Sequence, residues 1–198
     1  MLSFIKRIFT NNKKIIEILK KEGVGVLPTD TQYGLVGSAF SRRAVTKIYD
    51  LKSRIEKKSL IVLISSIDDL NMFGVEINEP AKAFMEKFWP GKVSIVLPFH
   101  NNRLYYLDKM GGTLAFRFPN KKSLINIIKD TGPLVAPSAN PEGYPPATNI
   151  MEARRYFYKW IDFYVDGGDL VSDPSTIVKI IGDKIEVIRE GAVKIDQK

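Results

Sequence analysis

The chain has 198 residues, of which 44% are hydrophobic and 26% are charged, a composition typical of a globular domain with its own core. It contains no cysteine, which excludes disulfides, thiolate metal sites and a cysteine nucleophile, and His100 is its only histidine. Lysine and arginine number 30 against 22 acidic residues, and the resulting charge of +8 favours polyanionic ligands such as nucleotides or RNA without choosing among them.

No apolar stretch approaches the length of a membrane-spanning helix. Residues 1–9 alternate apolar and charged side chains, and this segment is too short and too charged for a signal peptide. The sequence also lacks internal repeats, linkers and low-complexity segments. We therefore expect one cytoplasmic domain over residues 1–198, with no membrane partner.

The first predicted elements are a helix over residues 13–22, capped by asparagine, and a buried strand over residues 24–27. The strand runs into segment 28–35, whose sequence is PTDTQYGL. Pro28 has no N–H to give to a strand ladder, so it should end the strand. The segment then presents hydroxyl and carboxylate groups at a strand end, where α/β sheets usually bind ligands. An isolated Thr-Asp-Thr would be better explained as a polar loop.

The next helix, predicted over residues 42–51, is followed by cations that crowd its C-terminal end. They stand at positions 47, 52, 54, 57 and 58. Favourable interaction with the helix dipole is one explanation of this cluster. A clamp for a triphosphate is the other, because arginine offers forked donors and lysine a point charge. Composition alone does not decide between them.

The rest of the chain alternates between predicted strands and helices. We expect strands at 60–64, 93–99, 113–118, 134–136 and 163–165, helices at 68–70, 79–88, 121–129 and 149–158, a loop at 101–110, and a hairpin of strands 175–180 and 184–189. This order predicts an α/β fold, in which helices flank a twisted, mixed sheet with a central concave groove.

Two of these elements carry polar side chains that need an explanation. In strand 113–118, alternation places Thr113, Ala115 and Arg117 on one face. An arginine there is costly unless it meets an anion, although a surface-facing position would also explain it. Strand 134–136 runs into Pro-Ser-Ala-Asn, whose small residues let a ring or a phosphate approach the backbone. Serine and asparagine are also ordinary turn residues.

Together these motifs resemble the YrdC/TsaC-type threonylcarbamoyl-AMP synthase family. The resemblance rests on PTDTQYGL, Lys52-Ser53-Arg54, Trp89-Pro90-Gly91, Ala115-Phe116-Arg117, Pro137-Ser138-Ala139-Asn140, Asp166-Gly167-Gly168, Pro174-Ser175-Thr176-Ile177-Val178 and Arg189-Glu190-Gly191. Each segment is weak alone, but all stand in the family's order and cover about residues 12–191. The resemblance implies a single YrdC-like domain. Longer relatives carry a second C-terminal domain, which we do not expect here.

The resemblance also implies a function. Enzymes of this family are nucleotidyltransferases that condense L-threonine, bicarbonate and ATP to threonylcarbamoyl-AMP and pyrophosphate, for the N6-threonylcarbamoyladenosine modification of tRNA. Mg²⁺ bound with ATP and downstream proteins that transfer the group to tRNA are implied as well. Direct binding of tRNA or double-stranded RNA is left open. No protein nucleophile is needed, and the chain has no GxxxxGK[ST] phosphate loop.

The residues that match the family's site fall into two halves. The threonine half consists of Thr31, Arg117 and Ser175, with Ala136 and Leu63 lining the pocket. The ATP half consists of Lys52, Arg54, Lys58, Thr113, Ser138, Asn140, Pro146 and Arg189, with Lys52 and Arg54 stabilising charge. The chain departs from the family at Ile55 and Ser59, where prolines are common, and at Leu63, where some relatives have histidine. These departures imply a more mobile loop and a different side wall.

Two other functions compete with this one. A non-enzymatic RNA-binding or ribosome-assembly protein would explain the basic charge but not the ordered polar motifs. A carbamoyl-adenylate domain like that of hydrogenase maturation factors would share some chemistry, but such domains normally belong to a much longer protein. The requirement for threonine separates the synthase from both alternatives.

Overall fold

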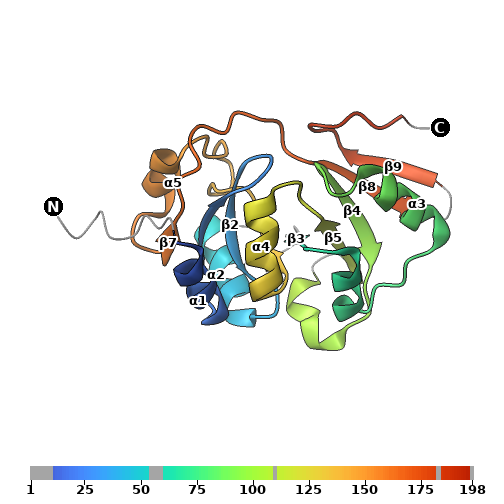
Figure 1. The fold of residues 1–198 in the computed structure, drawn as a ribbon, viewed down its shortest axis with the longest axis horizontal. Helices are drawn as coiled ribbons and strands as arrows, with labels where there is room; N and C mark the ends of the chain where they lie inside the picture. The colour runs from blue at the N-terminus through green and yellow to red at the C-terminus, as the bar shows by residue number, and fades with distance from the viewer. Residues whose placement is uncertain (1–10, 54–59, 109–110, 182–183, 197–198) are drawn as a thin grey trace.

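The computed structural model describes residues 11–53, 60–108, 111–181 and 184–196. Its strands are β1 (Gly25–Pro28), β2 (Tyr33–Ser38), β3 (Ile61–Leu63), β4 (Val93–Pro98), β5 (Thr113–Arg117), β6 (Leu134–Val135), β7 (Phe163–Tyr164), β8 (Thr176–Ile181) and β9 (Lys184–Arg189). They form one sheet in the order β7-β1-β2-β6-β3-β5-β4-β8-β9 (Figure 1). Pairs β1/β7, β3/β5 and β4/β8 are parallel and the others antiparallel. The predicted mixed sheet is confirmed.

Helices connect the strands. They are α1 (Asn12–Lys20), α2 (Arg42–Lys52), α3 (Glu79–Phe88), α4 (Lys122–Thr131) and α5 (Ile150–Phe157), with 3-10 helices η2 (Ile67–Phe73) and η3 (Asn102–Leu107). At α1, α2, α3 and α5 a side-chain oxygen accepts a backbone N–H of the first turn, from Asn11, Ser41, Asn78 and Asn149 respectively. No helix in the described part of the chain has both the length and the apolar character needed to span a membrane.

The helices cover the two faces of the sheet in two groups. Helices α1 and α4 lie against one face, where Leu19 and Ile128 share a core with Leu63 of β3 (Figure 1). On the other face, α2, α3 and α5 contribute to a larger core that includes Ile48 and Phe157. The central strands are therefore buried on both faces, which fits their nearly continuous apolar sequences.

One predicted element differs in the structure. The sequence predicts an exposed loop at residues 101–110, but η3 forms there and buries Leu104 and Leu107. Asn101 begins this helix by accepting the backbone N–H of Arg103. The segment kinks at Leu104, whose φ of -106° and ψ of 22° are not helical, and both leucines pack into the core. The last two positions of the predicted loop lie outside the described residues.

Candidate functional site

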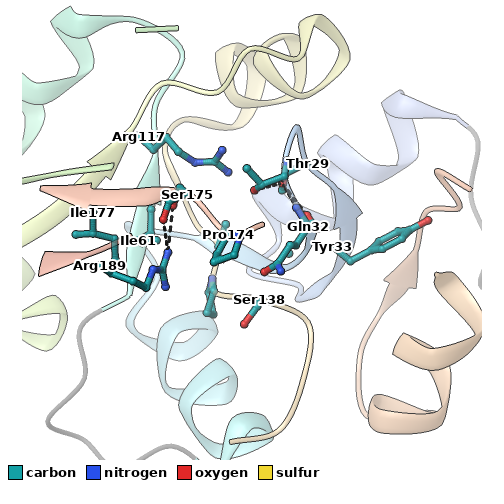
Figure 2. A pocket seen from close by; sticks show the side chains of 14 residues that line it. Thr29, Gln32, Tyr33, Ile61, Arg117, Ser138, Pro174, Ser175, Ile177 and Arg189 are labelled. Atoms are coloured by element: carbon teal, nitrogen blue, oxygen red, sulfur yellow. Dashed lines mark hydrogen bonds between the residues drawn. The ribbon is translucent and has the colours of Figure 1, made fainter. Parts of the chain in front are cut away.

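A cavity of about 130 Å³ lies where several segments distant in sequence meet (Figure 2). This space is much larger than the roughly 10–15 Å³ that a single water needs. Its lining consists of Thr29, Thr31, Gln32, Tyr33, Gly34, Ile61, Arg117, Ala136, Pro137, Ser138, Pro174, Ser175, Ile177 and Arg189. Hydroxyl groups and two guanidinium groups thus face an apolar wall, which suits a small polar anion with an apolar part.

The turn between β1 and β2 forms one side of the cavity, and its own side chains hold it. The Thr29 hydroxyl donates to the carbonyl of Gln32 at 2.6 Å and accepts the backbone N–H of Thr31 at 3.1 Å. The hydroxyl oxygens of Thr29 and Thr31 are also 3.1 Å apart. Threonine favours such local bonds to the backbone, and this explains why the chain turns here. The Thr31 hydroxyl is therefore fixed at the cavity wall.

Arg117, the last residue of β5, is buried rather than surface-facing, with only 4% of its surface exposed. Its Nη1 donates to Oδ1 of Asp30 at 2.7 Å, whereas its buried Nε has no hydrogen-bond partner among the described residues. Burial lowers the pKa of Arg117, and the negative charge of Asp30 offsets part of this effect. A buried guanidinium with one N–H unpaired favours a further acceptor, because an unpaired buried donor is costly.

Ser175 and Arg189 form another side of the cavity. The hydroxyl oxygen of Ser175 lies 2.9 Å from that of Ser94 in β4, while Nη2 of Arg189 donates to the Ser175 carbonyl at 2.6 Å. Figure 2 shows the guanidinium groups of Arg117 and Arg189 on either side of Ser175. The Ser175 hydroxyl is thus held between strands, with a positive charge near each side.

Lys52, at the end of α2, lies behind the cavity rather than in its lining. Its side chain is 2% exposed, and its ammonium donates to the carbonyls of Ser138 and Asn140, both at 2.6 Å, and to Oδ1 of Asn140 at 3.2 Å. The Lys52 carbonyl accepts the N–H of Glu142 at 2.7 Å. Three oxygens match the three donors of an ammonium. These contacts hold the Ser138 loop, and a direct bond from Lys52 to phosphate stays a prediction.

The structure brings together most of the predicted threonine half. Thr31, Arg117, Ser175 and Ala136 line the cavity, and Leu63 does not. Leu63 pairs with Arg117 across β3 and β5, but it is covered by the core beneath α1 and α4. Its neighbour Ile61, two residues away on the same face, lines the cavity instead.

The predicted ATP half is more dispersed. Ser138 and Arg189 line the cavity, and Asn140 is linked to it because its Oδ1 accepts the Ser138 hydroxyl at 2.6 Å. Thr113, at the start of β5, and Pro146 are not among the lining residues. The predicted phosphate ligands Arg54 and Lys58 lie outside the described residues.

The sequence patterns predict no role for Tyr33, which links two walls of the cavity. Its buried hydroxyl donates to the carbonyl of Gly168 and accepts the N–H of Gly167, both at 2.8 Å. The side chain of Gln32 donates to the carbonyl of Ser172 at 3.2 Å. The β1–β2 turn therefore holds the segment that carries Ser175. Both motifs, the one with Tyr33 and Asp-Gly-Gly, are recognisable in the sequence. Tyr33 and Gly167 are 134 residues apart, however, and no local pattern predicts that they are in contact.

Replacing Tyr33 with phenylalanine should lower the free energy of unfolding by about 1–3 kcal/mol, because the N–H of Gly167 loses its acceptor. Burial raises the pKa of Tyr33, and the bond from Gly167 opposes this only in part. As the pH rises, the Tyr33 hydroxyl therefore ionises in the unfolded chain before it ionises in the folded protein. The stability that the neutral hydroxyl contributes is present below about pH 10 and is lost as the pH rises through the pKa of the folded state.

Urea unfolding at neutral pH and at about pH 11 measures both effects. The Tyr33→Phe variant should lose less stability between the two pH values than the wild type. Tyr106→Phe is the matched comparison, since the Tyr106 hydroxyl donates to the carbonyl of Ala39 and, among the described residues, accepts no backbone N–H. A Tyr33→Phe variant as stable as the wild type at neutral pH would show that this link contributes nothing.

Comparison with known proteins places the chain in a family. The Sua5/YciO/YrdC family model, described as "Telomere recombination", matches residues 17–191. The threonylcarbamoyl-AMP synthase of Bacillus subtilis is 32% identical over 194 residues, which cover 95% of this chain and 56% of that protein. The threonylcarbamoyl-AMP synthase of Marinobacter nauticus is 30% identical over 164 residues, covering 80% of this chain and 85% of that protein.

The fold is shared with a solved structure of the same family. Sua5 of Pyrococcus abyssi, complexed with L-threonine, superposes with a TM-score of 0.85 at 28% identity, over 91% of this chain and 54% of that chain. The chain thus spans about half the length of the Bacillus and Pyrococcus proteins. Since the family model covers most of its residues, the chain belongs to the Sua5/YciO/YrdC family.

Proposed function

We propose that the protein is a threonylcarbamoyl-AMP synthase, which condenses L-threonine, bicarbonate and ATP and releases pyrophosphate. The observation that carries this proposal is the convergence of Thr31, Arg117 and Ser175 on one cavity that Ser138 and Arg189 also line. These residues come from both halves of the site that the family resemblance implies. Relatives named threonylcarbamoyl-AMP synthase that match most of this chain support the same activity.

In this proposal Arg117 binds the carboxylate of threonine. A guanidinium can hold a carboxylate through two parallel hydrogen bonds, and the unpaired Nε of Arg117 is a donor available for such a pair. The hydroxyls of Thr31 and Ser175, which line the same cavity, would bind the amine and hydroxyl of the amino acid. Ile61 and Ile177 form the apolar wall that its methyl group would contact.

The reaction asks for alignment and charge stabilisation rather than a protein nucleophile. The threonine amine combines with bicarbonate to give a carbamate and water. A carbamate oxygen then attacks the α-phosphorus of ATP, and the bond from this phosphorus to pyrophosphate breaks. Arg189 at the cavity and the predicted Arg54 and Lys58 would offset the charge on the phosphates. A cavity that fixes the amino acid beside these cations contributes mainly through proximity.

The proposal includes Mg²⁺ bound together with ATP. The carboxylate of Asp30, in the turn between the lining residues Thr29 and Thr31, is already bonded to Arg117 and to the N–H of Asn120. Among the described residues no three histidine, aspartate or glutamate side chains are grouped to hold an ion. The hydroxyl-rich lining fits an ion held through the triphosphate and water rather than by a protein cage. When bound, Mg²⁺ would neutralise charge on the departing pyrophosphate.

The partners that follow from this function are also proposals. The product would pass to proteins that transfer the threonylcarbamoyl group to tRNA, so the enzyme would act in tRNA processing. The charge of +8 is compatible with direct contact to tRNA, but it is equally explained by a basic site for ATP.

Pyrophosphate release from ATP should require both threonine and bicarbonate, because the attacking carbamate forms only from the two together. The measurement is coupled detection of pyrophosphate from the purified protein with Mg²⁺ and ATP, omitting one reactant at a time. With carbon-13 bicarbonate, mass spectrometry of the product should show one labelled carbon. Equal ATP turnover without threonine would contradict the synthase. Binding of double-stranded RNA with no pyrophosphate release would favour the RNA-binding alternative.

A further inference from the structure

Asp30 connects Arg117 to the segment that follows β5. Its Oδ1 accepts Nη1 of Arg117 at 2.7 Å, and its Oδ2 accepts the backbone N–H of Asn120 at 3.0 Å. The side chains of this ion pair are only 7% and 5% exposed, for Asp30 and Arg117 respectively. The carboxylate therefore fixes the position of the guanidinium relative to two separate segments of the chain.

The contact with Asp30 uses Nη1 of the guanidinium and leaves the buried Nε unpaired among the described residues. Nε and Nη2 share one edge of the planar group, and this edge can bind a second carboxylate with two parallel bonds. Without Asp30, the guanidinium would be free to turn about its terminal torsions and would present this edge only part of the time.

Lys121 completes the charge balance around Asp30. Its ammonium donates to the carbonyl of Thr29 at 3.3 Å, in the turn that also carries Asp30. Burial lowers the pKa of Lys121, and the negative charge of Asp30 opposes that effect. Arg117 bonds directly to the carboxylate and Lys121 to the backbone next to it, so two cations accompany one carboxylate and leave one positive charge in excess. A bound carboxylate would make the group neutral.

We propose that Asp30 is a positioning residue, which aims the Nε and Nη2 edge of Arg117 at the substrate carboxylate, while Lys121 replaces the positive charge that Asp30 cancels. This inference rests on the proposed function, and it assigns Asp30 a role that acts through Arg117 without contact with substrate. A purely structural ion pair between the same residues would affect the stability of the fold and leave substrate binding unchanged.

The first test measures threonine binding by calorimetry, with ATP present, for the wild type, Asp30→Ala and Asp30→Asn. The alanine variant should weaken threonine binding about tenfold or more, with a smaller loss for asparagine, which keeps one acceptor oxygen. The KM for ATP should be unchanged in both the Asp30→Ala and the Asp30→Asn variants. If Asp30→Ala fails to fold, the asparagine variant carries the test. Unchanged threonine affinity in a folded Asp30→Ala variant would overturn the proposal.

The second test follows the guanidinium itself and needs no enzymatic activity. In nitrogen-15 spectra without threonine, the Nε–H of Arg117 should exchange with solvent about tenfold faster in Asp30→Ala than in the wild type. Lys121→Met should weaken threonine binding without changing this exchange, because it removes charge and not the ion pair. If the Nε–H of Arg117 exchanges equally fast in the wild type and in Asp30→Ala, Asp30 does not position the guanidinium. Faster exchange in Lys121→Met would show that Lys121 also positions the guanidinium instead of only supplying charge.

Asp162→Ala is the matched control, because Asp162 also bonds one cation and one backbone N–H. Its Oδ2 accepts the ammonium of Lys47 at 3.0 Å and the N–H of Val24 at 2.8 Å, at the end of β1 opposite the cavity. This variant should alter neither threonine affinity nor Arg117 exchange. If the wild type itself does not bind threonine, the proposed function fails, while the exchange of Arg117 still decides whether Asp30 orients it.

Discussion

Replacing Arg117 with lysine should weaken threonine binding roughly tenfold to a hundredfold. Lysine keeps the positive charge beside Asp30 but offers no pair of parallel donors for a carboxylate. The loss of one charged hydrogen bond costs about 1.5–3 kcal/mol, and each 1.4 kcal/mol corresponds to about a factor of ten in affinity. Calorimetric titration of threonine with ATP present measures the change, and ATP affinity should stay the same.

The control for this substitution is Arg42→Lys. The guanidinium of Arg42 lies over the exposed ring of Tyr105, 5.3 Å from its centroid, and neither residue lines the cavity. Threonine affinity should be unaffected there. Equal threonine affinities for the wild type and Arg117→Lys would show that Arg117 does not bind the substrate carboxylate, so the threonine half of the site would have to be reassigned.

Replacing Lys52 with methionine should destabilise the nucleotide-free protein by about 3 kcal/mol or more. The substitution keeps a long apolar side chain and removes the ammonium, so the carbonyls of Ser138 and Asn140 and the amide oxygen of Asn140 lose a buried donor. Because Ser138 lines the cavity, the KM for ATP should rise as well. Urea unfolding without ligands and the KM for ATP measure the two effects.

These two readouts separate the roles that Lys52 can have. A direct phosphate ligand would change ATP affinity alone, whereas a residue that holds the Ser138 loop changes stability even when no nucleotide is present. Lys47→Met is the control, because Lys47 pairs with Asp162 at the surface and such pairs contribute only about 0–1 kcal/mol. A Lys52→Met variant as stable as the wild type would contradict the loop-holding role.

Much of the fold follows from local patterns in the sequence. Helix α3 has the predicted bounds, residues 79–88, because Asn78 caps it and Pro80 suits its first turn. The hairpin of β8 and β9 was also expected from two strand patterns around a turn signal. The 3-10 helix η3 was missed because its two buried leucines have the spacing of a short helix but lie among polar residues typical of a loop.

The candidate site was predicted less completely, since its geometry depends on contacts that local patterns do not contain. Alternation places Ile61 and Leu63 on one face of β3, but it does not say which of them a helix covers. The PTDTQYGL motif predicts the turn that forms one side of the cavity, but Arg117, the partner of Asp30, lies 87 residues away in sequence. The motifs therefore predict which segments form the site, but they do not predict the hydrogen bonds between those segments.

The position of β6 has a mechanical consequence for the domain. This strand has only two residues, and it stands between β2 and β3 in the middle of the sheet. Within the sheet, the edge formed by β7, β1 and β2 joins the other strands through β6 and the residues just after it. In this joint the Leu35 N–H donates to the Pro137 carbonyl at 2.9 Å and the Ala139 N–H to the Tyr33 carbonyl at 2.8 Å. The ion pair of Asp30 and Arg117 crosses that joint, as would any ligand that contacts Thr31 and Ser175 together. A bound substrate would therefore add a further link across this joint.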